Sequence, residues 1–221
     1  HNMNYPGIDY SNMTDHQIIR RAMIEDDYHT FFRLLETYDV NNYEEDVNFK
    51  TYDEVTWPLL VVAAAHYKIR YLIVLLELGA PVDVKVSRSV GITALFMSVQ
   101  NLGKTTHGDH RRGGNDYDSD GPDEPPLHQA ALAIACILVH WGADVNTQDS
   151  NGRTALHMAS IHLDSKMVQL LLEAGADTTL ATHTKRETAE NMIDGMFIEE
   201  GDCQDNDEYE MCSIENLFNM A

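Results

Sequence analysis

Apolar residues gather in short clusters along the chain, and the clearest pairs of clusters are closed by a glycine. The most regular pair is Ala155–Ala159 and Met167–Leu172, which is followed by Gly175. In the second cluster the apolar positions keep the spacing of an amphipathic helix. Glycine ends helices because it adopts the left-handed backbone conformation without penalty. The pattern therefore predicts pairs of short helices, each pair ending at a glycine.

The helix pair recurs along the chain. The start of the first helix and the closing glycine lie 21 residues apart in two copies, Pro58–Gly79 and Thr154–Gly175. A third copy, Thr93–Gly142, spans 49 residues and so carries 28 extra ones. A degenerate copy covers Ile18–Leu35, and a partial copy starts at Thr188. One helix pair cannot bury its apolar stripe alone, so the repeats predict an all-α solenoid of about four to five stacked helix-turn-helix units.

The residues from Asp149 to Asp177 resemble an ankyrin repeat. They begin Asp-Ser-Asn-Gly-Arg-Thr-Ala-Leu-His-Met-Ala and end Leu-Leu-Leu-Glu-Ala-Gly-Ala-Asp. The family pattern is D-x-x-G-x-T-P-L-H-x-A-A and then L-L-x-x-G-A-D, with Ala155 here in place of proline. The resemblance implies a solenoid with projecting finger loops that binds other proteins. It also implies a structural role for His157, whereas Thr154 is expected to cap the first helix.

The organisation of the chain follows from these copies. We expect an N-terminal tail over residues 1–13, an ankyrin repeat domain over residues 14–193 and an acidic tail over residues 194–221. An acidic insertion at about residues 103–126 separates the two helices of the third copy. Its glycine, proline and charge predict a mobile loop.

A short apolar pattern lies near the end of the chain. Ser213 can cap a helix whose apolar side consists of Ile214, Leu217 and Phe218. Two interpretations are open for this helix. It either folds back to cover the last repeat or serves as a docking peptide for a partner.

Charge narrows the function classes. The chain has 15 Lys+Arg and 36 Asp+Glu, which gives a net charge of −21. Such a surface repels phosphate backbones and anionic membranes, so we expect no direct nucleic-acid contact and no membrane binding. A protein partner with a basic segment is favoured instead. Much of the acidity falls on residues 41–54, the insertion and the C-terminal tail.

No catalytic pattern accompanies the repeats, so we expect a non-enzyme without cofactor. The phosphate-binding, serine-nucleophile and zinc-protease motifs are missing from the sequence. Cys136 lies in an apolar run and is expected to be buried. Asp116, Asp118 and Asp120 are spaced like the start of a calcium loop, but Leu127 replaces its final glutamate, so a solvated acidic loop is favoured over a metal site.

Cysteine usage and hydropathy bear on location. The three cysteines form no CxxC pair, which argues against a disulfide scaffold. No apolar run reaches the length of a membrane-spanning helix. We therefore expect an intracellular monomer, cytoplasmic or nuclear.

The family resemblance also implies where a partner would bind. Ankyrin proteins usually bind through finger loops and the first-helix face, and Trp57 at such a position fits binding and packing equally well. In the last copy the matching positions are Thr184, Lys185 and Glu187. In the other copies the predicted contact residues are Glu54, Trp57, His66, Ser89, Ile92, Gln100, Asn101, Ser150, Asn151, Arg153, Ile161 and His162.

Three narrower functions and one modification are compatible with the resemblance. The chain is similar in part to I-kappa-B-like regulators of transcription factors and to ankyrin substrate receptors of cullin ubiquitin ligases. A groove that takes a histone tail is the third alternative. Separately, Leu138, Asp144, Val145 and Asn146 stand at −8, −2, −1 and 0, which resembles the site at which asparaginyl hydroxylase modifies ankyrin repeats.

Overall fold

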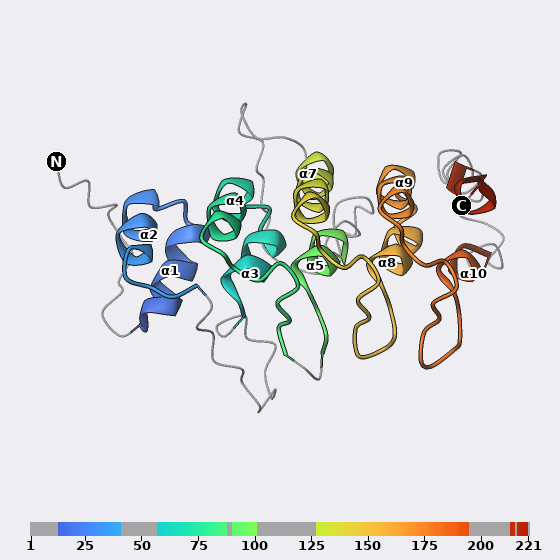
Figure 1. The fold of residues 1–221 in the computed structure, drawn as a ribbon, viewed down its shortest axis with the longest axis horizontal. Helices are drawn as coiled ribbons and strands as arrows, with labels where there is room; N and C mark the ends of the chain where they lie inside the picture. Colours follow the sequence, from blue (N-terminus) through green and yellow to red (C-terminus); the bar gives the residue numbers. More distant parts are fainter. Residues whose placement is uncertain are drawn as a thin grey trace, which may run out of the picture.

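A row of stacked helix pairs forms the molecule in the computed structural model (Figure 1). The structure describes residues 13–40, 57–87, 90–100, 127–194, 213–214 and 216–220. The helices are α1 (Asp15–Ile24), α2 (Tyr28–Leu35), α3 (Leu59–Ala65), α4 (Ile69–Glu77), α5 (Ala94–Gln100), α7 (Leu127–His140), α8 (Ala155–Ile161), α9 (Ser165–Glu173) and α10 (Ala189–Asp194). The predicted all-α solenoid is confirmed. Within the described residues the extended backbone amounts to one isolated bridge, between Ala181 and Thr188.

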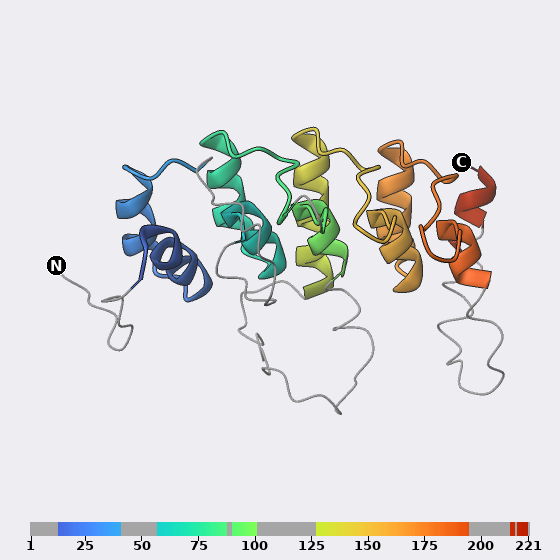
Figure 2. The same ribbon diagram turned by 90° about the horizontal axis from the view of Figure 1, so that it is seen from below.

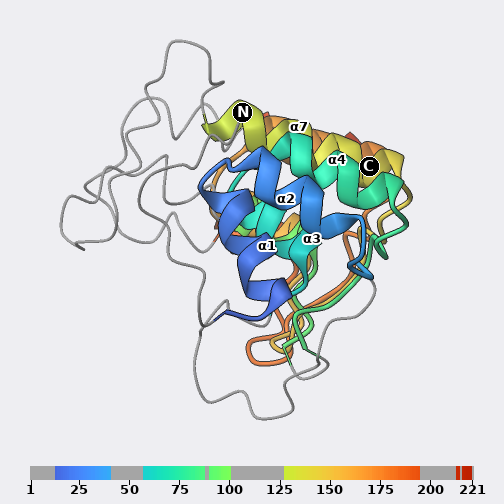
Figure 3. The same ribbon diagram turned by 90° about the vertical axis from the view of Figure 1, so that its left-hand side faces the viewer.

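The helices form two layers. The first helices of the pairs contact one another along the row, α3 against α5, α5 against α8 and α8 against α10. The second helices form the other layer, with α4 against α7 and α7 against α9 (Figure 2). Figure 3, which looks along the row, shows the long loops projecting on the side away from the second helices. The second helices therefore form one side of the solenoid, and the long loops form the opposite edge.

Apolar side chains fill the space between the layers. Leu72 and Leu75 of α4, Ile134 and Leu138 of α7 and Leu171 of α9 are fully buried. The first helices contribute small residues to the same core, and Ala63, Ala64 and Ala159 are fully buried. Burial of this apolar surface is the main driving force for stacking, since each helix pair exposes its stripe without a neighbour.

Helix ends follow the expected chemistry. The Thr154 hydroxyl accepts a hydrogen bond from the His157 backbone N–H at 3.4 Å, which confirms the predicted cap of α8. At the ends of α4, α7 and α9, three glycines have φ between +85° and +88°: Gly79, Gly142 and Gly175. These are the glycines at which the pattern predicts the helix ends, and that prediction is confirmed.

The C-terminal residues pack against the end of the row. Residues 216–220 are helical and lie beside α10 in Figures 1 and 2. Ile214 and Phe218 are buried within the common core, and Leu217 packs partly against it. This arrangement places the apolar side of the short helix on the last repeat.

The third copy contains Cys136 and the acidic insertion. Cys136 is exposed on α7, so the prediction that it is buried is wrong. Helix α7 is apolar nearly all round, and such a sequence does not indicate which side faces water. The predicted mobile insertion at residues 103–126 lies outside the described residues.

Candidate functional site

Three finger loops form the edge opposite the second helices. They are residues 80–92, 143–153 and 176–187, and they connect α4 to α5, α7 to α8 and α9 to α10 (Figure 1). Residues 88–89 of the first finger lie outside the described part of the chain. The fingers lie side by side along the row, so neighbouring repeats present their tips to the same side.

Hydrogen bonds tie each finger to the next. At the tips, the Ser150 N–H donates to the Val90 carbonyl at 2.9 Å, and the His183 N–H donates to the Asn151 carbonyl at 2.7 Å. Near the finger bases, the Asp144 N–H donates to Asp83 Oδ1 at 3.0 Å. The loops are therefore held in one arrangement before any partner arrives, which reduces the ordering cost of binding.

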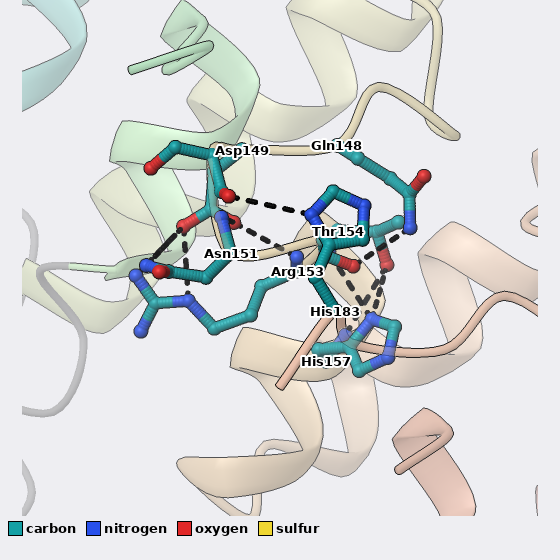
Figure 4. Close-up of polar contacts among 9 residues, drawn as sticks. Gln148, Asp149, Asn151, Arg153, Thr154, His157 and His183 are labelled. Atoms are coloured by element: carbon teal, nitrogen blue, oxygen red, sulfur yellow. Dashed lines mark hydrogen bonds and ion pairs between the residues drawn. The ribbon is translucent and has the colours of Figure 1, made fainter. Parts of the chain in front are cut away.

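A buried carboxylate fixes the shape of the middle finger (Figure 4). Asp149 Oδ1 accepts from the backbone N–H groups of Asn151 and Arg153, both at 2.8 Å. Its Oδ2 accepts from the Arg153 guanidinium at 2.9 and 2.7 Å. The same guanidinium lies 5.9 Å from the centre of the Phe96 ring. Arg153 is thus largely neutralised and is held against the finger, with 30% of its side chain exposed.

His157 joins this finger to the following repeat. Its Nδ1 lies 3.1 Å from the Thr154 N–H and 2.8 Å from the Thr154 hydroxyl, and its Nε2 lies 3.3 Å from the Glu187 carbonyl. A carbonyl only accepts, so the Nε2 atom carries the proton and Nδ1 accepts. Burial lowers the pKa of His157, and the hydrogen bond to Glu187 opposes this shift. The neutral imidazole is a structural link between repeats.

The predicted contact residues fall into four groups. Ser150 and Asn151 are exposed at the tip of the middle finger. Partly exposed are Ile92, Arg153, Gln100, Ile161, His162 and His66. Outside the described residues lie Glu54, Ser89 and Asn101. The remaining one, Trp57, is buried.

Trp57 packs at the junction of the first two repeats. It is 8% exposed and belongs to the common core. Its carbonyl accepts a hydrogen bond from His16 Nε2 at 3.0 Å, and His16 Nδ1 lies 2.7 Å from the Tyr38 hydroxyl. Of the two interpretations left open for Trp57, the structure favours packing. We therefore leave it out of the contact surface.

The tip of the last finger contains exposed residues that were not among the contact residues predicted from the sequence. His183 and Arg186 are exposed there, beside Thr184 and Lys185, which were predicted. Arg186 stands two residues before Thr188, as Gly91 and Gly152 stand two residues before Thr93 and Thr154. The sequence therefore aligns Arg186 with the glycines of the other fingers, and its exposure at this tip is what the structure adds.

Asn146 lies at the base of the middle finger. Its side-chain Oδ1 accepts from the Asp177 N–H at 2.7 Å, and its Nδ2 donates to the Gly175 carbonyl at 3.3 Å. The amide therefore holds the middle and last fingers together. A hydroxylase would have to reach Asn146 within these contacts.

Neither a metal site nor a membrane-spanning helix occurs in the described part of the chain. The calcium candidate Asp116, Asp118 and Asp120 lies outside the described ranges. Within those ranges, no three His, Cys, Asp or Glu side chains are grouped to hold a metal ion. Likewise, none of the described helices combines the length and the apolar character needed to cross a membrane.

Comparisons with known proteins agree with the repeat pattern. Residues 132–172 match the family model described as ankyrin repeats (many copies). The chain is 34% identical over 64 residues to protein fem-1 homolog C of Homo sapiens and of Bos taurus, which is 29% of this chain and 10% of each relative. It is 37% identical over 73 residues to a putative ankyrin repeat protein, FPV244, of Fowlpox virus (strain NVSL), which is 33% of this chain and 11% of that protein. The matched stretch is thus about a tenth of each relative.

Proposed function

On the premise that the chain is an ankyrin repeat protein, we propose that it is a non-catalytic adaptor or inhibitor that holds a protein partner. Ankyrin repeats generally mediate protein–protein interaction. The partner would contact the finger loops and the exposed side of the first helices. No cofactor takes part in this function.

One observation carries the proposal. The fingers are joined tip to tip by backbone hydrogen bonds, while the side chains of Ser150 and Asn151 between these bonds remain exposed. A fixed backbone with exposed side chains is suited to recognition, because little freedom is lost on binding. Ile92 of the first finger and Ile161 at the end of α8 are partly exposed and add apolar area to the polar tips. Apolar groups with a polar rim are the composition of a binding hot spot.

The partner's charge and the state of the chain are finer parts of the proposal. A basic segment in the partner is supported by the net charge of −21. The described residues carry 10 Lys+Arg against 16 Asp+Glu, so most of the acidity is elsewhere in the sequence. We further propose a monomer that acts inside the cell, in the cytoplasm or the nucleus.

Affinity capture tests the function. We expect the double variant Ser150→Arg, Asn151→Arg to lose proteins that the unaltered chain captures from a cell extract, as measured by quantitative mass spectrometry. The matched control is Gln169→Arg, which adds an arginine to an exposed position of α9. Equal capture by all three chains would contradict binding through the fingers.

The same capture separates the narrower alternatives. Recovery of cullin components would favour a substrate receptor of a ubiquitin ligase. A transcription factor would favour an I-kappa-B-like regulator, and histones would favour a histone-tail binder.

Hydroxylation of Asn146 is a separate proposal. It is supported by the residues before Asn146 and is tested by intact mass after incubation with asparaginyl hydroxylase. A gain of one oxygen atom is expected, and it should vanish in Asn146→Ala. No gain in the unaltered chain would refute it.

A further inference from the structure

The tip of the last finger differs from the other tips in its backbone register. Aligned hydrogen bonds run from the Val86 N–H to the Ile92 carbonyl, from Asp149 to Arg153 and from Thr182 to Glu187. The residue just before each acceptor is therefore equivalent in the three fingers. It is Gly91 in the first, Gly152 in the second and Arg186 in the third.

The two glycines are required by the neighbouring finger. A Cβ atom on Gly152 would lie 2.7 Å from the backbone nitrogen of His183, and one on Gly91 would lie 2.8 Å from the Gln148 carbonyl oxygen. Both distances are too short for a carbon atom. All three positions also have positive φ, +71° at Gly91, +80° at Gly152 and +60° at Arg186.

Arg186 is thus a long charged side chain in a backbone conformation that favours glycine. Residues other than glycine pay a conformational cost there. Within the described residues no further finger stacks on the last one, so the clash that excludes a side chain from the other tips does not arise. The side chain of Arg186 is exposed. Asp26, Tyr67 and Leu163 also have positive φ, so the backbone conformation alone does not distinguish Arg186. Its exposed positive charge at a finger tip does.

The charges around Arg186 favour a negative ligand. Lys185, beside it, has 75% of its side chain exposed and lies 3.7 Å from Glu187, which is 35% exposed. In the neighbouring loops, Asp149 is engaged by Arg153, and Asp177 by the Thr179 N–H and hydroxyl. Glu190 of α10 is exposed four residues beyond Arg186 and is the carboxylate that stands nearest to it in the sequence after Glu187. Among the described residues Arg186 has no carboxylate partner. This tip is therefore a local positive site on a strongly acidic chain.

We propose that Lys185 and Arg186 bind an acidic segment of the protein partner. This inference rests on the proposed function and adds the chemistry of one contact. An arginine guanidinium can hold a carboxylate through two hydrogen bonds, and the adjacent lysine adds a second cation. Several carboxylates in an extended segment would engage both side chains, because a single exposed ion pair contributes little.

A peptide titration tests the inference on the full chain. The probe is a glutamate octapeptide with blocked ends, added at about 0.15 M salt, where charges more than about 8 Å away are largely screened. We expect backbone amide NMR shifts at residues 183–187. Arg186→Gly and Lys185→Ala should each weaken the affinity about two- to five-fold, and the double variant should weaken it further.

Three controls accompany the titration, for folding, for position and for the charge of the peptide. Arg186→Gly removes the charge while relieving the backbone, so its melting temperature should stay equal or rise. Lys166→Ala removes a cation from exposed α9 and should leave the affinity unchanged. A lysine octapeptide should leave residues 183–187 unshifted.

Three outcomes overturn the inference. They are no shifts at residues 183–187, an affinity that is equal in the double variant, and an equal response to the lysine peptide. The capture experiment separates this inference from the proposed function. Capture of partner proteins could be lost in the Ser150, Asn151 double variant and kept in the Lys185, Arg186 double variant. That result would leave the proposed function standing and would contradict this contact alone.

Discussion

Two junctions between repeats, one at each end of the row, use the same contact, a histidine that donates a hydrogen bond to a backbone carbonyl of the next repeat. At the C-terminal junction His157 donates from Nε2 to the Glu187 carbonyl, and at the N-terminal junction His16 donates from Nε2 to the Trp57 carbonyl. Burial lowers the pKa of both imidazoles. In each case a neutral ring joins one repeat to the backbone of the next.

The two junctions differ in what satisfies the second ring nitrogen. His157 Nδ1 accepts from Thr154, three residues away, whereas His16 Nδ1 accepts from the Tyr38 hydroxyl, 22 residues away. The first partner is part of a local helix cap, and the second is brought in by packing. The same histidine link between repeats can therefore be supported by a residue close in the sequence or by one brought near by tertiary packing.

His157→Ala is expected to have the largest effect on this comparison. It removes a buried ring, leaves the Thr154 N–H without its acceptor and breaks the link to Glu187, which should lower the free energy of unfolding by about 3 kcal/mol. Urea unfolding measures the loss. His157→Asn, which keeps an acceptor near the Nδ1 position, should recover part of it.

His16→Ala should cost less, about 2 kcal/mol, because this ring is only partly buried. The same urea measurement applies. A loss greater than that of His157→Ala would reverse the comparison and make the N-terminal junction the stronger one.

Tyr38→Phe isolates the tertiary partner. Loss of the hydroxyl should cost about 1 kcal/mol and raise the pKa of His16, because the neutral ring then loses the hydrogen bond at Nδ1. NMR titration of His16 follows the pKa. The control is Tyr67→Phe, since the buried Tyr67 hydroxyl has no hydrogen-bond partner among the described residues. Equal effects in the two variants would count against the His16–Tyr38 bond.

The smallest expected effect is on the pH dependence of the free energy of unfolding. Both folded-state pKa values lie below the ordinary value of 6.5. The stability that each neutral ring provides is therefore complete above about pH 6.5 and is lost as pH falls through the lowered pKa. Urea unfolding at several pH values should show a shallower acid slope in His16→Gln and in His157→Gln than in the unaltered chain. An unchanged slope in both glutamine variants would show that other groups control the loss of stability in acid.

Local chemistry accounts for what the sequence predicts. The cap at Thr154 and the helix end at Gly175 depend on residues a few positions apart, and both predictions are confirmed. Cys136 and Trp57 depend on which elements pack against them, so periodicity did not settle either. Trp57 in particular is held by His16, 41 residues away.

The contact surface was only partly predictable for the same reason. Positions in the middle finger follow directly from the Asp149–Thr154 pattern. Arg186 stands two residues before Thr188, as Gly152 stands two residues before Thr154, so the sequence aligns it with a glycine. Whether a side chain fits at this position depends on what stacks beside the finger, which the sequence does not show.

Gly152 and Arg186 also determine how the array can be lengthened. A glycine at this position leaves room for one more finger, and an arginine takes up that room. To graft an additional repeat behind α10, an engineer would have to change Arg186 to glycine and remove the helix at residues 216–220 that covers the same end. One loop residue and one short helix together thus determine whether this end of the solenoid accepts a further unit.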